Sequence, residues 1–219
     1  MAYALMSSGG KDSTLALDRA RRTGLDVRFL ANIYDGSSGR VRFHGIRSEL
    51  IEAQAASLGL ECVQAGSRPE EFESAFGGVL DDLKARGCRG MVFGNIHLED
   101  VRGWYERRVR AKGLEHIEPL WGEPGIELAH EVVERGYRVV VVGVDLNRPA
   151  AGFLGRELDA DLLTEIGITD GLDAAGECGE YHTFVYDGPS FAYPLLIRPG
   201  KPVEFDGHRF LDLTLAPLH

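Results

Sequence analysis

The chain has 219 residues, a formal net charge of −10 and 44% hydrophobic residues. The acidic balance argues against a broad nucleic-acid-binding face, and with no apolar run of membrane-spanning length and no signal-like start we expect a cytoplasmic protein without membrane attachment. The three cysteines, Cys62, Cys88 and Cys178, show no CxxC spacing, which favours reduced thiols over a disulfide framework or a zinc site.

The first apolar strand, residues 3–6, runs directly into a glycine-rich loop, residues 7–13. Two successive glycines permit a tight turn and let backbone N–H groups approach an anion. The helix predicted from residue 12 to about 23 directs its positive end into this turn. We therefore expect a phosphate-binding loop made of Ser7, Ser8, Gly9, Gly10, Lys11, Asp12 and Ser13.

We considered two other interpretations of this glycine-rich loop, and the residues exclude one of them. A Walker A motif is absent, because Lys11 is followed by Asp12 and no glycine stands five residues before Gly10. A plain strand-to-helix turn, in which Asp12 or Ser13 only caps the helix, remains the structural alternative.

Apolar runs then alternate with helix-period stretches, which predicts βαβ units and a doubly wound parallel α/β sheet. The predicted strands are 27–34, 61–64, 90–94, 116–120 and a β-branched, buried central strand at 137–144, and the predicted helices are 48–58, 69–85, 98–111 and 127–135. After about residue 145 the pattern changes to a helix near 159–166 and strands at 183–186, 193–197, 202–205 and 210–215. We expect an ATP-binding domain at 1–145 and a smaller α+β subdomain at 146–219.

Ligands of open parallel sheets bind beyond the carboxyl ends of the strands, where the strand order reverses. This rule selects Asn32 after the second strand, and Gly94 and Asn95 after the fourth. His44 follows the second strand in a loop from which it could reach the phosphates. Each of these residues taken alone is also compatible with an ordinary turn or loop.

A second polar cluster spans residues 176–185. It contains Gly176, Glu177, Cys178, Gly179, Glu180, His182 and Thr183. Its carboxylates could hold Mg²⁺ or orient a reacting amine, and the alternative is a polar turn that enters a strand.

Together these stretches resemble the diphthine–ammonia ligase family of PP-loop ATP pyrophosphatases, within the adenine nucleotide alpha hydrolase-like superfamily. The resemblance rests on 7–13, 43–45, 54–60, 94–107, 119–121, 154–159 and 176–189. It implies a fold of the PP-loop type and a reaction in which ATP adenylates a carboxylate, pyrophosphate leaves, AMP is the later product, and ammonia forms an amide.

The resemblance also implies roles for individual residues. The residues expected to take part in catalysis are Lys11, Asp12, Glu177, Glu180 and His182. The nucleotide is expected to contact residues 7–13 together with Asn32, His44, Gly94 and Asn95, and the acceptor to contact Gly176, Cys178, Gly179 and Thr183. Asp12 and Glu177 are the expected ligands of Mg²⁺. Two residues depart from the family pattern: Cys178 stands where Gly or Asn is usual, and Asn95 where Asp or Ala is common.

The sequence does not identify the acceptor carboxylate, which could be carried by a protein. The sequence is also compatible with a homodimer. Alternatives are a nucleotide-binding sensor without turnover, or an adenylating enzyme of the same fold with a different acceptor. Transfer of sulfur to tRNA is disfavoured because a CxxC pair is lacking. The basic run 107–112 could meet an anionic acceptor, and a solvated helix face is the alternative.

Overall fold

The computed structural model describes residues 1–217 and contains a six-stranded, mostly parallel sheet. Its parallel strands lie in the order β4-β2-β1-β5-β6, and a short strand, β3, pairs antiparallel with the end of β2. The bounds are β1 (Ala2–Met6), β2 (Asp26–Asp35), β3 (Arg40–Val41), β4 (Glu61–Ser67), β5 (Cys88–Val92) and β6 (Glu115–Ile117). The strand order reverses between β1 and β5, so the loops after these strands define the expected ligand site.

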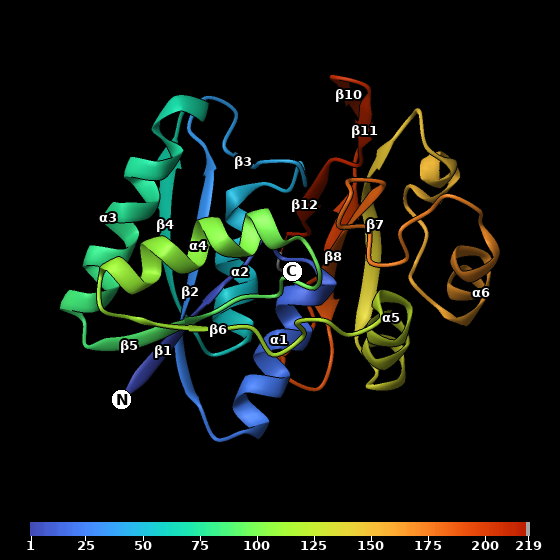
Figure 1. The fold of residues 1–219 in the computed structure, drawn as a ribbon. Helices are drawn as coiled ribbons and strands as arrows, with labels where there is room; N and C mark the ends of the chain where they lie inside the picture. The colour runs from blue at the N-terminus through green and yellow to red at the C-terminus, as the bar shows by residue number, and fades with distance from the viewer. Residues whose placement is uncertain (218–219) are drawn as a thin grey trace.

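Helices cover both faces of this sheet (Figure 1). Each face of the sheet has its own hydrophobic core, and successive residues of β1 belong to different ones. Leu5 packs in the core that includes α1 and α2, and Ala4 packs in the core that includes α3 and α4. The helices are α1 (Lys11–Arg22), α2 (Ser48–Ser57), α3 (Phe72–Ala85), which the short helix η1 (Pro69–Glu71) precedes, and α4 (Glu99–Ala111). The predicted doubly wound α/β fold is therefore confirmed.

A second sheet, in the order β10-β11-β7-β8, is antiparallel. Its strands are β7 (Arg138–Asp145), β8 (Tyr181–Asp187), β10 (Val203–Phe205) and β11 (His208–Phe210). β7 is a buried central strand as predicted, but it lies in this sheet and has no partner in the parallel one. A continuous β-branched run fits a buried strand of either kind, so the run did not reveal its partners. Because β7 belongs to the same sheet as strands of the later residues, the division between the two sheets falls before β7. The domain boundary at residue 145 stays a prediction.

The second sheet packs against α1 and α2 on the side away from the parallel sheet. Val141 of β7 and Phe184 of β8 belong to the same core as Leu15 of α1 and Ile51 of α2. In Figure 1 α1 accordingly lies between the parallel sheet and β7. The remaining elements are α5 (Gly125–Glu134), η2 (Pro149–Phe153), α6 (Ala160–Ile168), β9 (Ile197–Pro199) and β12 (Leu213–Leu215).

Two predicted strands of the C-terminal part were wrong in their extent. Residues 193–196 form bends and irregular backbone, and only Ile197 begins a strand. The predicted strand at 210–215 is divided between β11 and β12, which belong to different sheets. Within residues 1–217, no helix is long and apolar enough to cross a bilayer.

Candidate functional site

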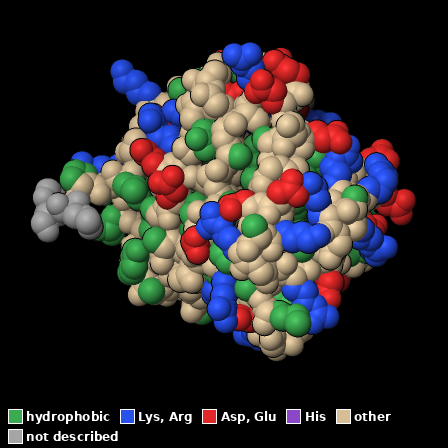
Figure 2. All heavy atoms as spheres, turned by 90° about the vertical axis from the view of Figure 1, so that its left-hand side faces the viewer, with side chains coloured by type: hydrophobic (Ala, Val, Ile, Leu, Met, Phe, Trp, Pro, Cys, Tyr) green, Lys and Arg blue, Asp and Glu red, His purple; other side chains and the backbone are tan. Residues whose placement is uncertain are grey.

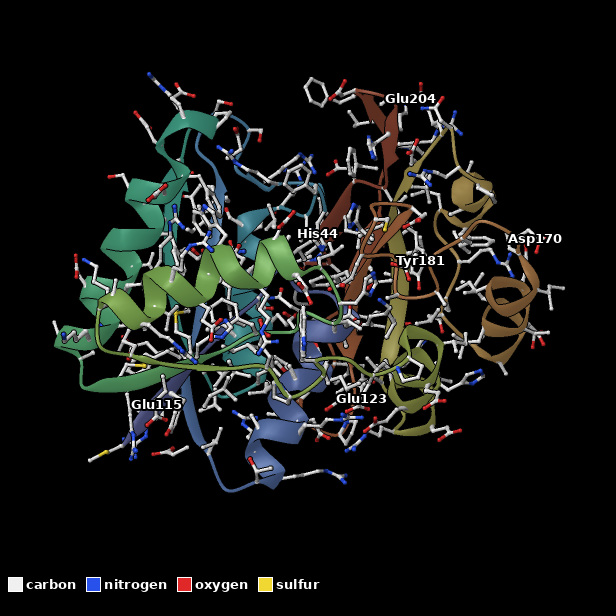
Figure 3. All side chains as sticks on the ribbon, in the orientation of Figure 1. His44, Glu115, Glu123, Asp170, Tyr181 and Glu204 are labelled. Atoms are coloured by element: carbon white, nitrogen blue, oxygen red, sulfur yellow. The ribbon has the colours of Figure 1, made fainter. Side chains whose placement is uncertain are left out.

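A cavity of about 1040 Å³ opens at the reversal point of the strand order. Its walls come from the loop after β1, the loops after β2 and β5, and the segment that leads into β8. This volume lies at the upper end of the roughly 300–1,000 Å³ of small-molecule sites, so a nucleotide and part of a second substrate would fit together. In Figure 3, His44 lies near the centre of the molecule and Tyr181 lies at the second sheet, where it pairs with β7; both line the cavity.

Hydroxyl groups hold the loop 7–13 in its turn. The Ser7 Oγ lies 3.0 Å from the Ser13 Oγ and accepts a hydrogen bond from the Gly9 N–H at 3.0 Å. The Ser13 hydroxyl also donates to the Gly10 carbonyl. Gly9 has a φ of 86°, which favours glycine. The loop is thus pre-formed at the first turn of α1, whose N–H groups lack partners within the helix.

Hydrogen bonds from the second sheet also hold the loop 7–13 in place. The Thr183 Oγ1 of β8 accepts a hydrogen bond from the Lys11 N–H at 3.1 Å. The Gly9 carbonyl accepts from the Val185 N–H at 2.9 Å and from the Gln54 Nε2 at 3.1 Å. The Gln54 Nε2 donates as well to the Val185 carbonyl at 2.7 Å. Because Gln54 is fully buried, it fixes the loop against β8, a role that the sequence did not predict.

The Lys11 side chain crosses from α1 to the segment before β8. It is only 3% exposed, and its Nζ donates to the Asp12 Oδ2 at 2.9 Å and to the Ala175 carbonyl at 2.5 Å. Burial disfavours the charge of Lys11, but Asp12 and Tyr181 more than offset this and raise its pKa. Burial raises the pKa of Asp12, and the charge of Glu177 adds to that rise although Lys11 opposes it. A cation and two carboxylates therefore meet at the loop 7–13.

Residues of β2 and of the loop after β5 contact the loop 7–13 on the side of the parallel sheet. The Asn32 Nδ2 donates to the Ser7 carbonyl at 2.8 Å. A Cβ at Gly94 would lie 2.7 Å from the Ser13 nitrogen, so only glycine permits this approach of the chain to α1. The Asn95 Nδ2 donates to the Glu118 Oε1 at 2.8 Å. Asn32, Gly94 and Asn95 all line the cavity.

Glu177 joins the segment before β8 to the loop after β5. Its two carboxylate oxygens accept hydrogen bonds from the Ile96 and His97 N–H groups, each at 2.9 Å. The Asp173 carboxylate accepts from the Ala175 and Glu177 N–H groups, each at 3.0 Å, and so stabilises the turn. These contacts hold residues 173–177 against the end of the parallel sheet.

Of the histidines within residues 1–217, His44, His182 and His208 line the cavity. The rings of His44 and His182 lie 4.4 Å apart between centroids. Burial lowers the pKa of His44 to about 4, and burial together with His44 lowers the pKa of His182 well below its usual value. The pair is therefore neutral at pH 7. Beside it, Phe43 has a φ of 62°, which is strained for a bulky side chain.

The structure brings most of the predicted site residues into one cavity. Those that line it are Ser7, Ser8, Gly10, Lys11, Asp12, Ser13, Asn32, His44, Gly94, Asn95, Gly176, Glu177, Cys178, Gly179, His182 and Thr183. Gly9 and Glu180 do not line it. A Cβ at Gly9 would contact Ile51, whereas the buried Glu180 side chain faces the Asp173 N–H and Arg148.

An aromatic part of the wall was not predicted. Phe72, Phe93, Trp104 and Tyr105 line the cavity, and their mutual packing includes Phe72 against Trp104 at 5.6 Å between centroids. Trp104 has helical core spacing in the sequence, which does not distinguish a core position from a cavity wall. Such rings could contact a base or another planar group.

The basic run 107–112 is largely paired with acids. Arg108 lies 2.7 Å from Glu73, and Lys112 lies 2.6 Å from Asp81. Figure 2 shows Lys and Arg side chains interspersed with Asp and Glu on the face that includes α3. This pairing supports the interpretation as a solvated helix face.

Two family models together match most of the chain. Residues 1–116 match the family described as diphthamide synthase N-terminal domain, and residues 124–212 match the diphthamide synthase C-terminal domain. The chain is 23% identical to a diphthine–ammonia ligase of Mus musculus over 247 residues, covering 100% of this chain and 92% of the relative. It is also 23% identical to the diphthine–ammonia ligase of Rattus norvegicus, with the same coverage.

A similar solved structure is described as a predicted subunit of tRNA methyltransferase from Methanocaldococcus jannaschii. The similarity has a TM-score of 0.47 and 18% identity, and covers 84% of this chain and 96% of that chain.

Proposed function

The chain belongs to the diphthamide synthase family, and from that premise we propose that it is an ATP-dependent ligase that adenylates a carboxylate and transfers it to ammonia. The observation that carries the proposal is the shared cavity: the phosphate loop 7–13 and the acidic segment 176–183 line the same space. Relatives named diphthine–ammonia ligase support C–N bond formation as the reaction. Diphthine, a carboxylate carried by a protein, is accordingly the acceptor that we propose.

In this reaction an oxygen of the acceptor carboxylate attacks the α-phosphorus of ATP, and the bond to the β-phosphate breaks. The first turn of α1 and its loop would bind the phosphates through backbone N–H groups. The Lys11 charge would offset the negative charge that develops on the leaving pyrophosphate. A Lys11 side chain already held by Asp12 and Ala175 needs little reordering for this task.

The Asp12 and Glu177 carboxylates fit a divalent cation. Burial, with a smaller contribution from the charge of Glu177, raises the pKa of Asp12, and a nearby cation would favour the ionised form of both carboxylates. When bound, Mg²⁺ would neutralise phosphate charge during transfer. Both oxygens of Glu177 accept backbone hydrogen bonds, which would leave the carboxylate fixed in orientation for such a role.

In the second half of the reaction, ammonia attacks the acyl carbon of the adenylate, AMP leaves with the bonding electrons, and the nitrogen loses a proton. We assign that proton to His182, because this side chain lines the cavity and an imidazole can accept a proton. Glu180 is a poorer candidate for direct contact, since its side chain faces Arg148. We assign Gly176, Cys178 and Gly179 to the acceptor side, and Thr183 to support of the phosphate loop.

ATP turnover with α-labelled and γ-labelled nucleotide, in the presence of ammonia and a diphthine-bearing protein, tests the proposal. Formation of AMP and pyrophosphate that depends on the acceptor is the expected result. Formation of ADP and phosphate would overturn the cleavage mechanism. Tight binding of ATP without turnover would favour a sensor, and turnover with other carboxylates but not with diphthine would indicate a different acceptor.

A further inference from the structure

A cluster of three possible metal ligands lies at the edge of the cavity. One ligand atom each from His97, Asp173 and Cys178 lies within 4.8 Å of the other two. His97 comes from the loop after β5, whereas Asp173 and Cys178 come from the segment between α6 and β8. The cluster therefore connects two parts of the chain that are far apart in sequence, and Cys178 also lines the cavity.

The spacing of the first two ligands suits a tetrahedral ion. The His97 Nε2 lies 3.5 Å from the Asp173 Oδ2. Ligands at about 2.0–2.3 Å from a tetrahedral ion lie about 3.3–3.7 Å from each other. The two atoms could thus share an ion with hardly any movement, and the exposed Cys178 side chain would supply the third ligand by rotation.

A carboxylate and backbone N–H groups surround the cluster. The His97 Nδ1 lies 3.2 Å from the Glu177 Oε2, so a carboxylate stands beside this ring nitrogen while Nε2 lies near Asp173. Histidine ligands of metals are typically oriented in this way by a carboxylate on the other ring nitrogen. Asp173 is fixed by the Ala175 and Glu177 N–H groups, and both of its oxygens retain a free lone pair.

From this geometry we propose that His97, Asp173 and Cys178 form a site for a transition-metal ion of the Zn²⁺ class. A nitrogen, an oxygen and a thiolate sulfur suit Zn²⁺, whereas Mg²⁺ takes oxygen ligands. Only one cysteine takes part, so the CxxC spacing that marks many zinc sites is not required. Three protein ligands leave the fourth position open toward the cavity, and a bound ion would clamp the loop after β5 to the segment before β8.

Titration of the untagged, reduced full chain with Co²⁺ tests the site, because a bound thiolate gives a charge-transfer band that Mg²⁺ cannot produce. We expect one Co²⁺ per chain, displaced by Zn²⁺ but not by excess Mg²⁺. Cys178→Ser should abolish the band, and His97→Gln should weaken Zn²⁺ binding at least 10-fold. Glu177→Gln, which keeps all three ligands, should weaken it by about 10-fold.

Two matched variants serve as controls. Cys62→Ser removes a thiol of β4 and His130→Gln removes an exposed imidazole of α5; both should retain the wild-type affinity. The proposal is overturned if no saturable band forms, if the band persists in Cys178→Ser, or if excess Mg²⁺ displaces the ion. These readouts need no ATP turnover, so they are independent of the proposed ligase reaction.

Discussion

The Thr183 Oγ1 accepts a hydrogen bond from the Lys11 backbone N–H at 3.1 Å. This contact joins the first residue of α1 to the middle of β8, and both residues are buried. The phosphate loop is thus supported by the second sheet as well as by the strand that precedes it. Its predicted roles can be tested one residue at a time.

Thr183→Val keeps the shape of the side chain but leaves the buried Lys11 N–H without its acceptor. We expect a loss of about 1–3 kcal/mol in the free energy of unfolding, together with a higher KM for ATP. Urea unfolding and initial-rate kinetics measure the two effects. Thr183→Ser, which restores the hydroxyl, should recover most of both; equal losses in the two variants would contradict the assigned hydrogen bond.

Lys11→Met removes the cation from the phosphate loop. If the Lys11 charge stabilises the departing pyrophosphate, kcat for AMP formation should fall by about 10²–10³-fold, as for loss of one electrostatic group at a reacting centre. Lys201→Met, at an exposed position, is the matched control and should leave the rate unchanged. A rate for Lys11→Met within a few-fold of wild type would refute the role.

Gly94→Ala places a Cβ 2.7 Å from backbone atoms of Asp12 and Ser13. Because backbone cannot move aside as a flexible side chain can, the loop after β5 must shift. We expect about 1–3 kcal/mol of destabilisation and at least 10-fold weaker ATP binding, measured by calorimetry. Gly77→Ala in α3, where a Cβ meets nothing within 4 Å, should bind ATP normally and unfold at the same or higher urea concentration.

His44 should make the protein less stable in acid. Burial lowers the pKa of His44 to about 4 in the folded chain, against about 6.5 when it is unfolded. Between these values the unfolded chain binds more protons, so the free energy of unfolding falls as the pH falls. From pH 7 to pH 5 this one group accounts for about 2 kcal/mol.

Urea unfolding of His44→Gln at both pH values measures that contribution. The variant should lose about 2 kcal/mol less than wild type on acidification, whereas His130→Gln should behave as wild type. An unchanged pH dependence in His44→Gln would show that this imidazole is not the group responsible.

The sequence predicted the parallel sheet well because each strand and helix has a distinct local period. It could not assign β7 to the second sheet, since a buried β-branched run does not identify its partners. The same limit applies to the site. Glycines, lysine and carboxylates in 7–13 and 176–183 were recognised from local chemistry, but Gln54 and Trp104 acquire their positions only through tertiary contacts. Gln54 is a buried amide inside a helix, and nothing in its neighbours along the chain indicates that it bonds to Gly9.

The hydrogen bonds of Gln54 to the Gly9 and Val185 carbonyls have a consequence for dissection of the protein. A fragment that ends before β7 would contain every residue of the phosphate loop and the whole parallel sheet. It would nevertheless lose Thr183, which accepts from the Lys11 N–H, and Val185, which donates to the Gly9 carbonyl. The loop would then lack its hydrogen bonds to the second sheet. The two sheets therefore divide the fold between them, but the cavity that we propose for the nucleotide takes its walls from both.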